Sequence, residues 1–133
     1  MAGLRRVNKE LAQESRRPGD SVRFCELDHA FHSGYVEGVV GPRLLALHRA
    51  IKPQGDRYSR LYVSVVHDQL ANSVKEHEKI AASIAKGDVD GAQHATETNW
   101  HNAAERLTRT IAKQGERGSW QALAPDGPPP RKR

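Results

Sequence analysis

The sequence predicts an all-α protein, an antiparallel bundle of about six helices, and three observations lead to this fold class. Apolar residues recur at helical spacing through most of the chain, whereas no β-like alternation persists for more than a few residues. Glycine and proline interrupt this pattern at intervals that suit helix ends. The chain of 133 residues, 28% charged and 37% hydrophobic, can build one core. It contains no run of the ~18 apolar residues that a membrane span needs.

Three helices are expected in the first half of the chain. The first ends before Pro18, and the second begins at a capping residue, Asp20 or Ser21. Pro42 suits the first turn of the third helix, because that position needs no backbone N–H. We expect this third helix to end at residues 53–55, where proline and glycine follow each other closely.

The second half is also expected to be helical. The segment Leu61–Val66 is rich in β-branched residues and could form a strand by itself, but it has no partner strand, so we interpret it as a buried helix. The next helix is expected to begin at a cap, Asn72 or Ser73, and to end at Lys86 before a C-terminal glycine. Asp88 then starts the last long helix.

The chain divides into a helical domain, residues 1–115, and a flexible, proline-rich basic tail, residues 116–133. The net charge is +5, and three of the positive charges lie in Arg131–Arg133, directly behind a proline run. Such an end is typically solvated and disordered, so the charge alone does not predict DNA binding. The single cysteine, Cys25, cannot form an internal disulfide, and there is no signal peptide. We therefore expect a cytoplasmic protein with no membrane association.

Two segments place metal-competent side chains on inward faces of helices. Asp28 and His32 are four residues apart, so a helix stacks them on one face, which also carries apolar residues. His77 has apolar neighbours at helical spacing. A carboxylate or an imidazole on an inward face is costly unless it binds something. The alternative is a buried polar cluster that hydrogen bonds satisfy without a metal.

Several short motifs follow one another along residues 4–112: Asp28-x-x-Phe31-His32, Gly41-Pro42-x-Leu44, Ser73-x-x-Glu76-His77-x-x-Ile80, and Ser83-Ile84 followed by Gly87-Asp88 and Ala92. As an ordered set they resemble the C-terminal effector domain of GntR-type regulators, in the FadR-like branch whose all-helical domain is called FCD. The resemblance implies a helical bundle that binds a small carboxylate-bearing metabolite, often through a divalent metal.

The resemblance also implies metal ligands. The family uses an Asp and a His of the first motif, the histidine of the Glu-His motif and a third histidine on the last helix, which carries over to Asp28, His32 and His77. These oxygen and nitrogen ligands suit Zn²⁺, Ni²⁺ or Mn²⁺, with positions left for oxygens of the effector. The family's spacing places the third histidine at Asn99, which shares a face with alanines, whereas His101 shares a polar face. Asn99, through its carbonyl oxygen, is therefore the expected fourth ligand.

Two arginines are candidates for effector binding. Arg57 and Arg60 occupy positions where a basic side chain can pair with a carboxylate, and the alternative is a solvated helix face. Five further side chains are expected to have no such role, as packing residues or surface histidines: Trp100, Trp120, His48, His67 and His94.

The motif around Asp28 begins so early that no winged helix-turn-helix is expected ahead of it, and one or two of the family's first helices are expected to be missing. Such a bundle exposes an apolar face, which favours a homodimer. DNA would then be reached only through an absent or partner winged-helix module.

The sequence therefore predicts the effector-binding and dimerisation domain of a GntR/FadR-type transcriptional regulator, sensing a small organic acid through a divalent metal. We do not expect an enzyme, because the chain has no Gly-rich phosphate loop, nucleophile elbow or H-E-x-x-H motif. The alternatives are a small stand-alone metal-binding protein or metalloenzyme, and a dimerisation remnant without a ligand. A metalloenzyme would need a general base within reach of an open metal position. A remnant would keep its partner after mutation of Asp28 and His77.

Overall fold

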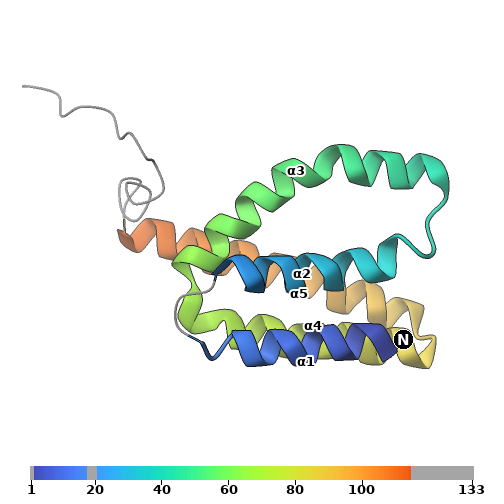
Figure 1. Cartoon of the computed structure of the whole chain (residues 1–133), viewed down its shortest axis with the longest axis horizontal. Helices are drawn as coiled ribbons and strands as arrows, with labels where there is room; N and C mark the ends of the chain where they lie inside the picture. Colours follow the sequence, from blue (N-terminus) through green and yellow to red (C-terminus); the bar gives the residue numbers. More distant parts are fainter. Residues whose placement is uncertain (1, 18–20, 115–133) are drawn as a thin grey trace, which may run out of the picture.

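The computed structural model describes residues 2–17 and 21–114, and over these ranges the chain is an all-helical bundle (Figure 1). Its elements are α1 (Ala2–Glu14), α2 (Ser21–Val36), α3 (Pro42–Val65), the short 3₁₀ turn η1 (His67–Gln69), α4 (Leu70–Lys86) and α5 (Val89–Gln114). The predicted fold class is confirmed, with five α-helices and one 3₁₀ turn in the described ranges. None of these helices is both long and apolar enough to span a membrane. The predicted tail lies outside the described residues.

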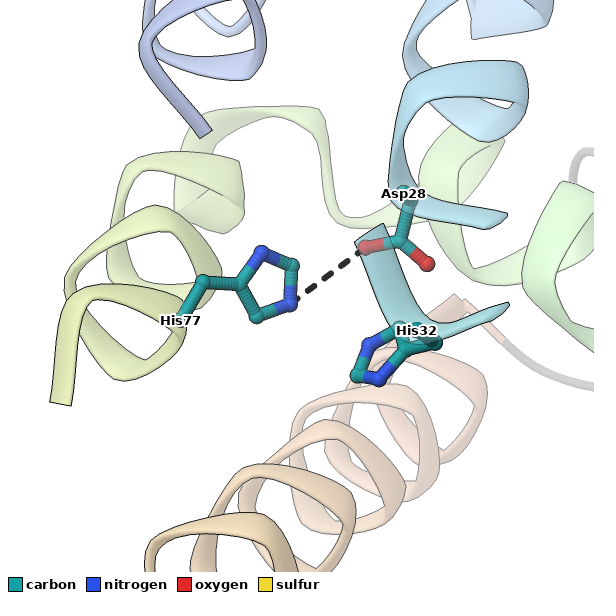
Figure 2. A group of neighbouring side chains, drawn as sticks. All are labelled: Asp28, His32 and His77. Atoms are coloured by element: carbon teal, nitrogen blue, oxygen red, sulfur yellow. Dashed lines mark ion pairs between the residues drawn. The ribbon is translucent and has the colours of Figure 1, made fainter. Parts of the chain in front are cut away.

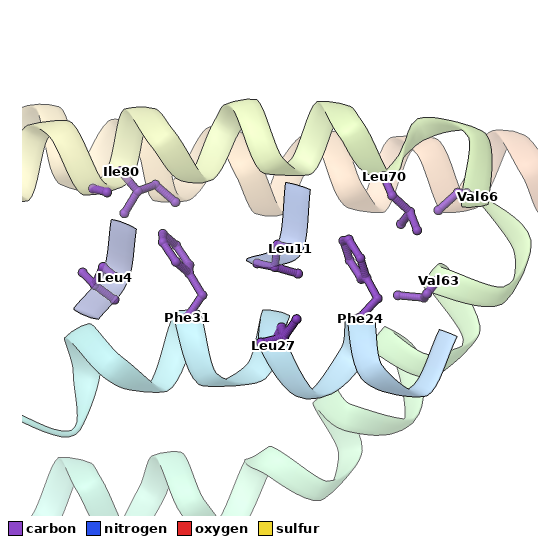
Figure 3. Packing of buried hydrophobic residues seen from close by; sticks show 10 residues of the cluster. Leu4, Leu11, Phe24, Leu27, Phe31, Val63, Val66, Leu70 and Ile80 are labelled. Carbon is purple, nitrogen blue, oxygen red and sulfur yellow. The ribbon is translucent and has the colours of Figure 1, made fainter. Parts of the chain in front are cut away.

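Helices α1, α2, α4 and α5 pack closely, whereas α3 stands apart from them over half its length. α1 lies against α2 and α4, and α4 packs along α5. Figure 1 shows α3 leaving the end of α2, arching away from the other helices and returning to them near its C-terminal end. The buried hydrophobic residues accordingly come from α1, α2, α4 and the C-terminal end of α3 (Figure 3): Leu4, Leu11, Phe24, Leu27, Phe31, Val63, Val66, Leu70, Ile80 and Ala81.

The expected end of the third helix at residues 53–55 is wrong, because α3 continues through Pro53 to Val65. Proline removes one backbone hydrogen bond and crowds the preceding turn. Pro53 is exposed, however, so water can hydrate the carbonyl that loses its partner. The ion pair between Lys52 Nζ and Asp56 Oδ2, at 3.4 Å, also spans the proline on the helix surface. The predicted first-turn position of Pro42 and the helical state of 61–65 are confirmed.

The predicted N-terminal cap of α4 is wrong, and its predicted C-terminal end is confirmed. α4 begins at Leu70, ahead of the expected caps Asn72 and Ser73, because η1 leads directly into it. Its end is as predicted, since Gly87 has φ 71° and donates its N–H back to the last turn. Asp88 then accepts a hydrogen bond from the N–H of Gly91 at 2.9 Å, as expected for the residue that starts α5.

Candidate metal centre

Three of the predicted ligands meet in the structure. Asp28 and His32 project from α2 and His77 projects from α4, and the three side chains point toward one another (Figure 2). Each offers one ligand atom, and these atoms all lie within 4.8 Å of one another. His77 Nε2 is 3.5 Å from Asp28 Oδ1. The fold thus brings a carboxylate and two imidazoles, from separate segments of the chain, to one point.

His77 is the most deeply buried member of this cluster. Its side chain is 1% exposed, its ring is stacked on Phe31 at 4.3 Å, and the ring of His32 meets it edge-on at 4.9 Å. Neither of its ring nitrogens has a hydrogen-bond partner among the described residues. A buried polar atom without a partner costs about 1–3 kcal/mol. The orphaned imidazole beside a carboxylate and a second imidazole fits a metal ion, and the donor set is one that Zn²⁺, Ni²⁺ and Mn²⁺ accept.

The protonation states of the cluster favour a cation. Burial raises the pKa of Asp28 to about 7. Burial, together with the nearby His29, lowers the pKa of His32 to about 4. Burial, with the charges of His32 and Arg106, lowers the pKa of His77 well below its usual value. Both imidazoles are therefore neutral at pH 7 with lone pairs to donate, and a cation would favour the ionised form of Asp28.

Tyr35 holds one face of the cluster. Its hydroxyl oxygen is 2.8 Å from His32 Nδ1. In the tautomer that frees His32 Nε2 for a metal, Nδ1–H donates to this oxygen, which fixes the plane of the ring. Burial raises the pKa of Tyr35 to about 12, so the hydroxyl is neutral.

A cavity of about 480 Å³ opens beside the cluster, a size typical of small-molecule sites. Residues of α2 and α3 line it, Asp28 and His32 among them, and α5 contributes Trp100. The Trp100 ring lies 5.2 Å from that of His32, yet the residue is 52% exposed, so it forms part of the cavity wall rather than being the expected packing residue. His48 also lines the cavity, although we expected it on the surface.

The two candidate arginines lie in different places. Arg60 lines the cavity and forms no ion pair with another residue of the described ranges. Arg57 is exposed and is not among the lining residues. His94 is exposed as expected, whereas Trp120 and the side chain of His67 lie outside what the structure describes.

Of positions 99 and 101 on α5, position 99 is the buried one, as the helical spacing predicted. Asn99 is 4% exposed, while the side chain of His101 is 74% exposed and lies 3.2 Å from Glu105. The amide nitrogen of Asn99 donates to Glu76 Oε2 at 2.9 Å. The carbonyl oxygen is the only metal-ligating atom that this amide has left, and its role as a ligand stays a prediction.

A buried polar network next to the cluster was missed in the sequence. Arg106 donates to both oxygens of Glu76, at 2.8 and 3.0 Å, to Tyr62 Oη at 2.7 Å and to Ser73 Oγ at 3.2 Å. Asn102 donates to Glu76 as well, at 2.9 Å. Burial alone would raise the pKa of Glu76, but the hydrogen bonds lower it below its usual value. The available signal was the spacing of positions 99, 102 and 106, which places three donors on one face of α5.

These features define an all-helical domain with a cluster of metal-type ligands on the wall of a small-molecule cavity. The family model of the FCD domain matches residues 1–102, and the chain belongs to this family. FCD domains are the regulatory, effector-binding domains of GntR-family transcription regulators. No curated protein and no solved structure matches the chain.

Proposed function

We propose that this domain senses a small carboxylate-bearing metabolite through a divalent metal held by Asp28, His32 and His77. The observation that supports this most strongly is the convergence of their ligand atoms within 4.8 Å, where neither buried ring nitrogen of His77 has a hydrogen-bond partner among the described residues. The resemblance of the surrounding motifs to FCD effector domains supports the same assignment.

Each residue has a distinct task in this proposal. Asp28 supplies negative charge, and His32 and His77 supply neutral nitrogen donors. The metal supplies positive charge that attracts carboxylate oxygens of the effector. Arg60, a cavity-lining cation without an ion-pair partner in the described ranges, binds a second acidic group of the effector. Because Arg57 is exposed away from the cavity lining, we assign this role to Arg60 alone.

Ligand binding is coupled to output by a shift of α3. The cavity is bounded by α2 on one side and α3 on the other, so a ligand that contacts both favours one spacing of the two helices. The effect passes to a DNA-binding winged-helix module in a partner chain or elsewhere in the regulator.

We further propose that the functional unit is a homodimer. On α3 the apolar residues Leu44, Leu47 and Ile51 are each 56% exposed and Tyr58 is 64% exposed. Their spacings of three, four and seven residues place them on one narrow face of the helix. A continuous exposed apolar stripe on a helix that lies away from the rest of the bundle favours self-association.

The test is metal content and metal-dependent melting of the purified chain. We expect wild type to bind one divalent ion and to melt at a higher temperature with it. His77→Ala should lose both effects, as should Asp28→Asn, which changes the charge at nearly constant shape. His101→Ala is the matched control, because it removes an exposed histidine. Wild type without metal, or a His77→Ala protein that binds as well as wild type, would overturn the proposal.

The effector is tested on the metal-loaded protein. A panel of mono-, di- and tricarboxylic acids should include members that raise the melting temperature of the loaded protein and leave the metal-free protein unchanged. An acid that stabilises both forms equally would show that the metal does not mediate recognition.

A further inference from the structure

The cavity beside the candidate metal centre has an apolar lining that comes from three helices. Val22 of α2, Ile51 of α3 and Trp100 of α5 all line it. Each of the three is more than half exposed, at 59%, 56% and 52%. Single exposed apolar residues are common on protein surfaces, but several that converge on one concavity mark a binding surface for an apolar group.

Most of the charged groups in the lining already have partners within the chain. Asp56 Oδ1 lies 3.2 Å from His29 Nδ1, and Asp56 Oδ2 lies 3.4 Å from Lys52 Nζ. Glu26 is paired with Arg23 at 3.4 Å. A ligand rich in hydroxyl groups would compete with these pairs for the same atoms, whereas an apolar ligand body leaves them in place.

Trp100 connects the apolar lining to the candidate metal centre. Its ring centroid lies 5.2 Å from that of His32, and the two ring planes are inclined by 38°. Asp28 and His32 line the same cavity as Trp100. The carbon skeleton of a carboxylate bound at the cluster therefore begins beside the indole ring. An aromatic ring is the group that gains most from this neighbour, because offset stacking adds to the burial of apolar area.

The opposite wall of the cavity leaves room for such a ring. Gly55 lines the cavity from α3, and a Cβ at this position would have no atom within 4 Å. The cavity volume of about 480 Å³ is within the range of sites that hold drug-sized ligands. A ring and its carboxylate thus fit together in the cavity, whereas a short aliphatic acid would leave much of the apolar lining in contact with water.

We propose that the effector is an aromatic carboxylic acid whose ring lies on Trp100, and that Trp100 selects this class of acid. The inference rests on the proposed function, because the metal centre holds the carboxylate. Arg60, which also lines the cavity, is then available to a second acidic substituent on the ring.

The experiment measures dissociation constants of the Zn²⁺-loaded chain for benzoate, cyclohexanecarboxylate and acetate by calorimetry. The three acids share one carboxylate and differ in the group attached to it. Benzoate should bind at least about 10-fold more tightly than acetate, because the ring removes apolar area from water. It should bind about 2- to 10-fold more tightly than cyclohexanecarboxylate, because only the aromatic ring stacks on indole. Gluconate, a polyhydroxy acid, should bind no more tightly than acetate.

Two variants locate the ring. Trp100→Ala should remove most of the difference between benzoate and acetate while leaving the affinities for acetate and Zn²⁺ unchanged, which a general disturbance of His32 would not do. Gly55→Leu, which fills space on the opposite wall, should weaken the binding of benzoate but not of acetate. His101→Ala is the matched control, because it removes an exposed ring from the next position of α5 and does not alter the cavity lining.

Fluorescence tests the contact directly. 4-Nitrobenzoate, whose ring quenches indole emission on contact, should quench wild type and leave the remaining emission of Trp100→Phe unchanged. Benzoate that binds no more tightly than acetate overturns the inference, as does a Trp100→Ala protein that keeps the preference or a wild type that prefers gluconate. In these cases Zn²⁺ binding by wild type would leave the metal site standing. If wild type binds no Zn²⁺, the proposed function fails and this inference with it.

Discussion

The α4–α5 pair and the N-terminal half of α3 are built in opposite ways. In the pair, Arg106 and Glu76 are almost fully buried and each group of the network has its hydrogen-bond partner. On α3, by contrast, Leu44, Leu47 and Ile51 are half exposed, and the helix arches away from the bundle (Figure 1). The cavity lies between α2, which packs into the bundle and carries the candidate ligands Asp28 and His32, and α3, which carries Arg60 nearer its C-terminal end. A rigid wall and a loosely held wall are what a ligand sensor needs, because ligand binding can move only the wall that is not already fixed.

The largest expected effect breaks the rigid side. Arg106→Ala leaves the carboxylate of Glu76 buried without its cation and removes the contacts to Tyr62 and Ser73. Breaking a buried ion pair by deleting one partner costs about 3–5 kcal/mol. We expect a loss of this size in the free energy of unfolding, measured by urea denaturation. Arg60→Ala, which removes an exposed side chain of α3, is the control and should change it by less than about 0.5 kcal/mol. Equal losses in the two variants would contradict the contrast.

The double variant Glu76→Gln/Arg106→Met refines this result. It removes both charges from the network while keeping the side-chain volumes similar. It should recover much of the stability that Arg106→Ala loses, because no isolated charge stays buried. A double variant as unstable as the single one would show that the contacts to Tyr62 and Ser73, rather than the ion pair, stabilise the fold.

The next effect concerns pH and the metal-free protein. The raised pKa of Asp28, about 7 against an ordinary value near 3.8, means that its contribution to stability is full below pH 3.8 and is lost as pH rises through 7. The lowered pKa of His32, about 4, has the opposite sign, since its contribution is present above 6.5 and is lost as pH falls through 4. Between about pH 4 and 6.5, the pH dependence of stability that comes from Asp28 and the one that comes from His32 therefore have opposite signs.

Asp28→Asn removes the contribution of Asp28 to the pH dependence of stability and leaves that of the histidines. At pH 8 the variant avoids a buried carboxylate, so we expect the metal-free protein to be about 2 kcal/mol more stable than wild type. Below pH 6.5 it should lose stability more steeply than wild type, because His32 and His77 are no longer opposed. Urea denaturation at half-unit pH steps, without metal, measures both effects. Parallel pH profiles for variant and wild type would show that Asp28 is not titrating in this range.

Metal binding should follow the same carboxyl group. Since a metal needs the ionised form of Asp28, its affinity should fall by roughly 10-fold for each pH unit below 7. Binding at pH 6 should release close to one proton, which calorimetry in buffers of different ionisation enthalpy measures. If no proton is released at pH 6, Asp28 does not lose its proton when the metal binds and is not a ligand.

A smaller effect tests the apolar stripe on α3. Leu47→Glu places a charge in the middle of the stripe, so we expect the dimer dissociation constant to rise at least 10-fold, or about 1.4 kcal/mol. Sedimentation velocity over a range of concentrations measures it. Arg57→Glu is the control, because Arg57 is an exposed residue of the same helix outside the stripe. A wild-type chain that stays monomeric at all concentrations would remove the proposed dimer.

The contrast between the two regions also explains what the sequence could predict. Helical spacing was sufficient to place Asp28, His32, His77 and Asn99 on inward faces, because a regular helix in a packed bundle converts spacing into burial. It also separated Asn99 from the exposed His101. These predictions concern the rigid side, where each helix has close neighbours.

Sequence reasoning failed where the outcome depended on tertiary partners. Arg106 reads as a solvated charge, since nothing local indicates that Glu76 and Tyr62 will meet it. The continuation of α3 through Pro53 was missed because local propensity opposes it, and the helix survives through exposure and surface pairing. Trp100 was expected to be a packing residue, but its place on a cavity wall depends on the distance between α3 and the other helices.

The smallest expected effect isolates the loosely held wall. Pro53→Ala restores a backbone hydrogen bond in the middle of α3 and removes the steric conflict with the preceding turn. If the N-terminal half of α3 opens independently, it is already unfolded before the rest of the bundle unfolds. The free energy of global unfolding should then change by less than about 0.5 kcal/mol. Amide hydrogen exchange should instead slow over residues 43–52 and stay unchanged in α4 and α5. A gain in global stability near the ~3 kcal/mol that an interior proline costs would show that α3 unfolds together with the bundle. In that case the two walls of the cavity form one cooperative unit, and effector binding would have to move them together.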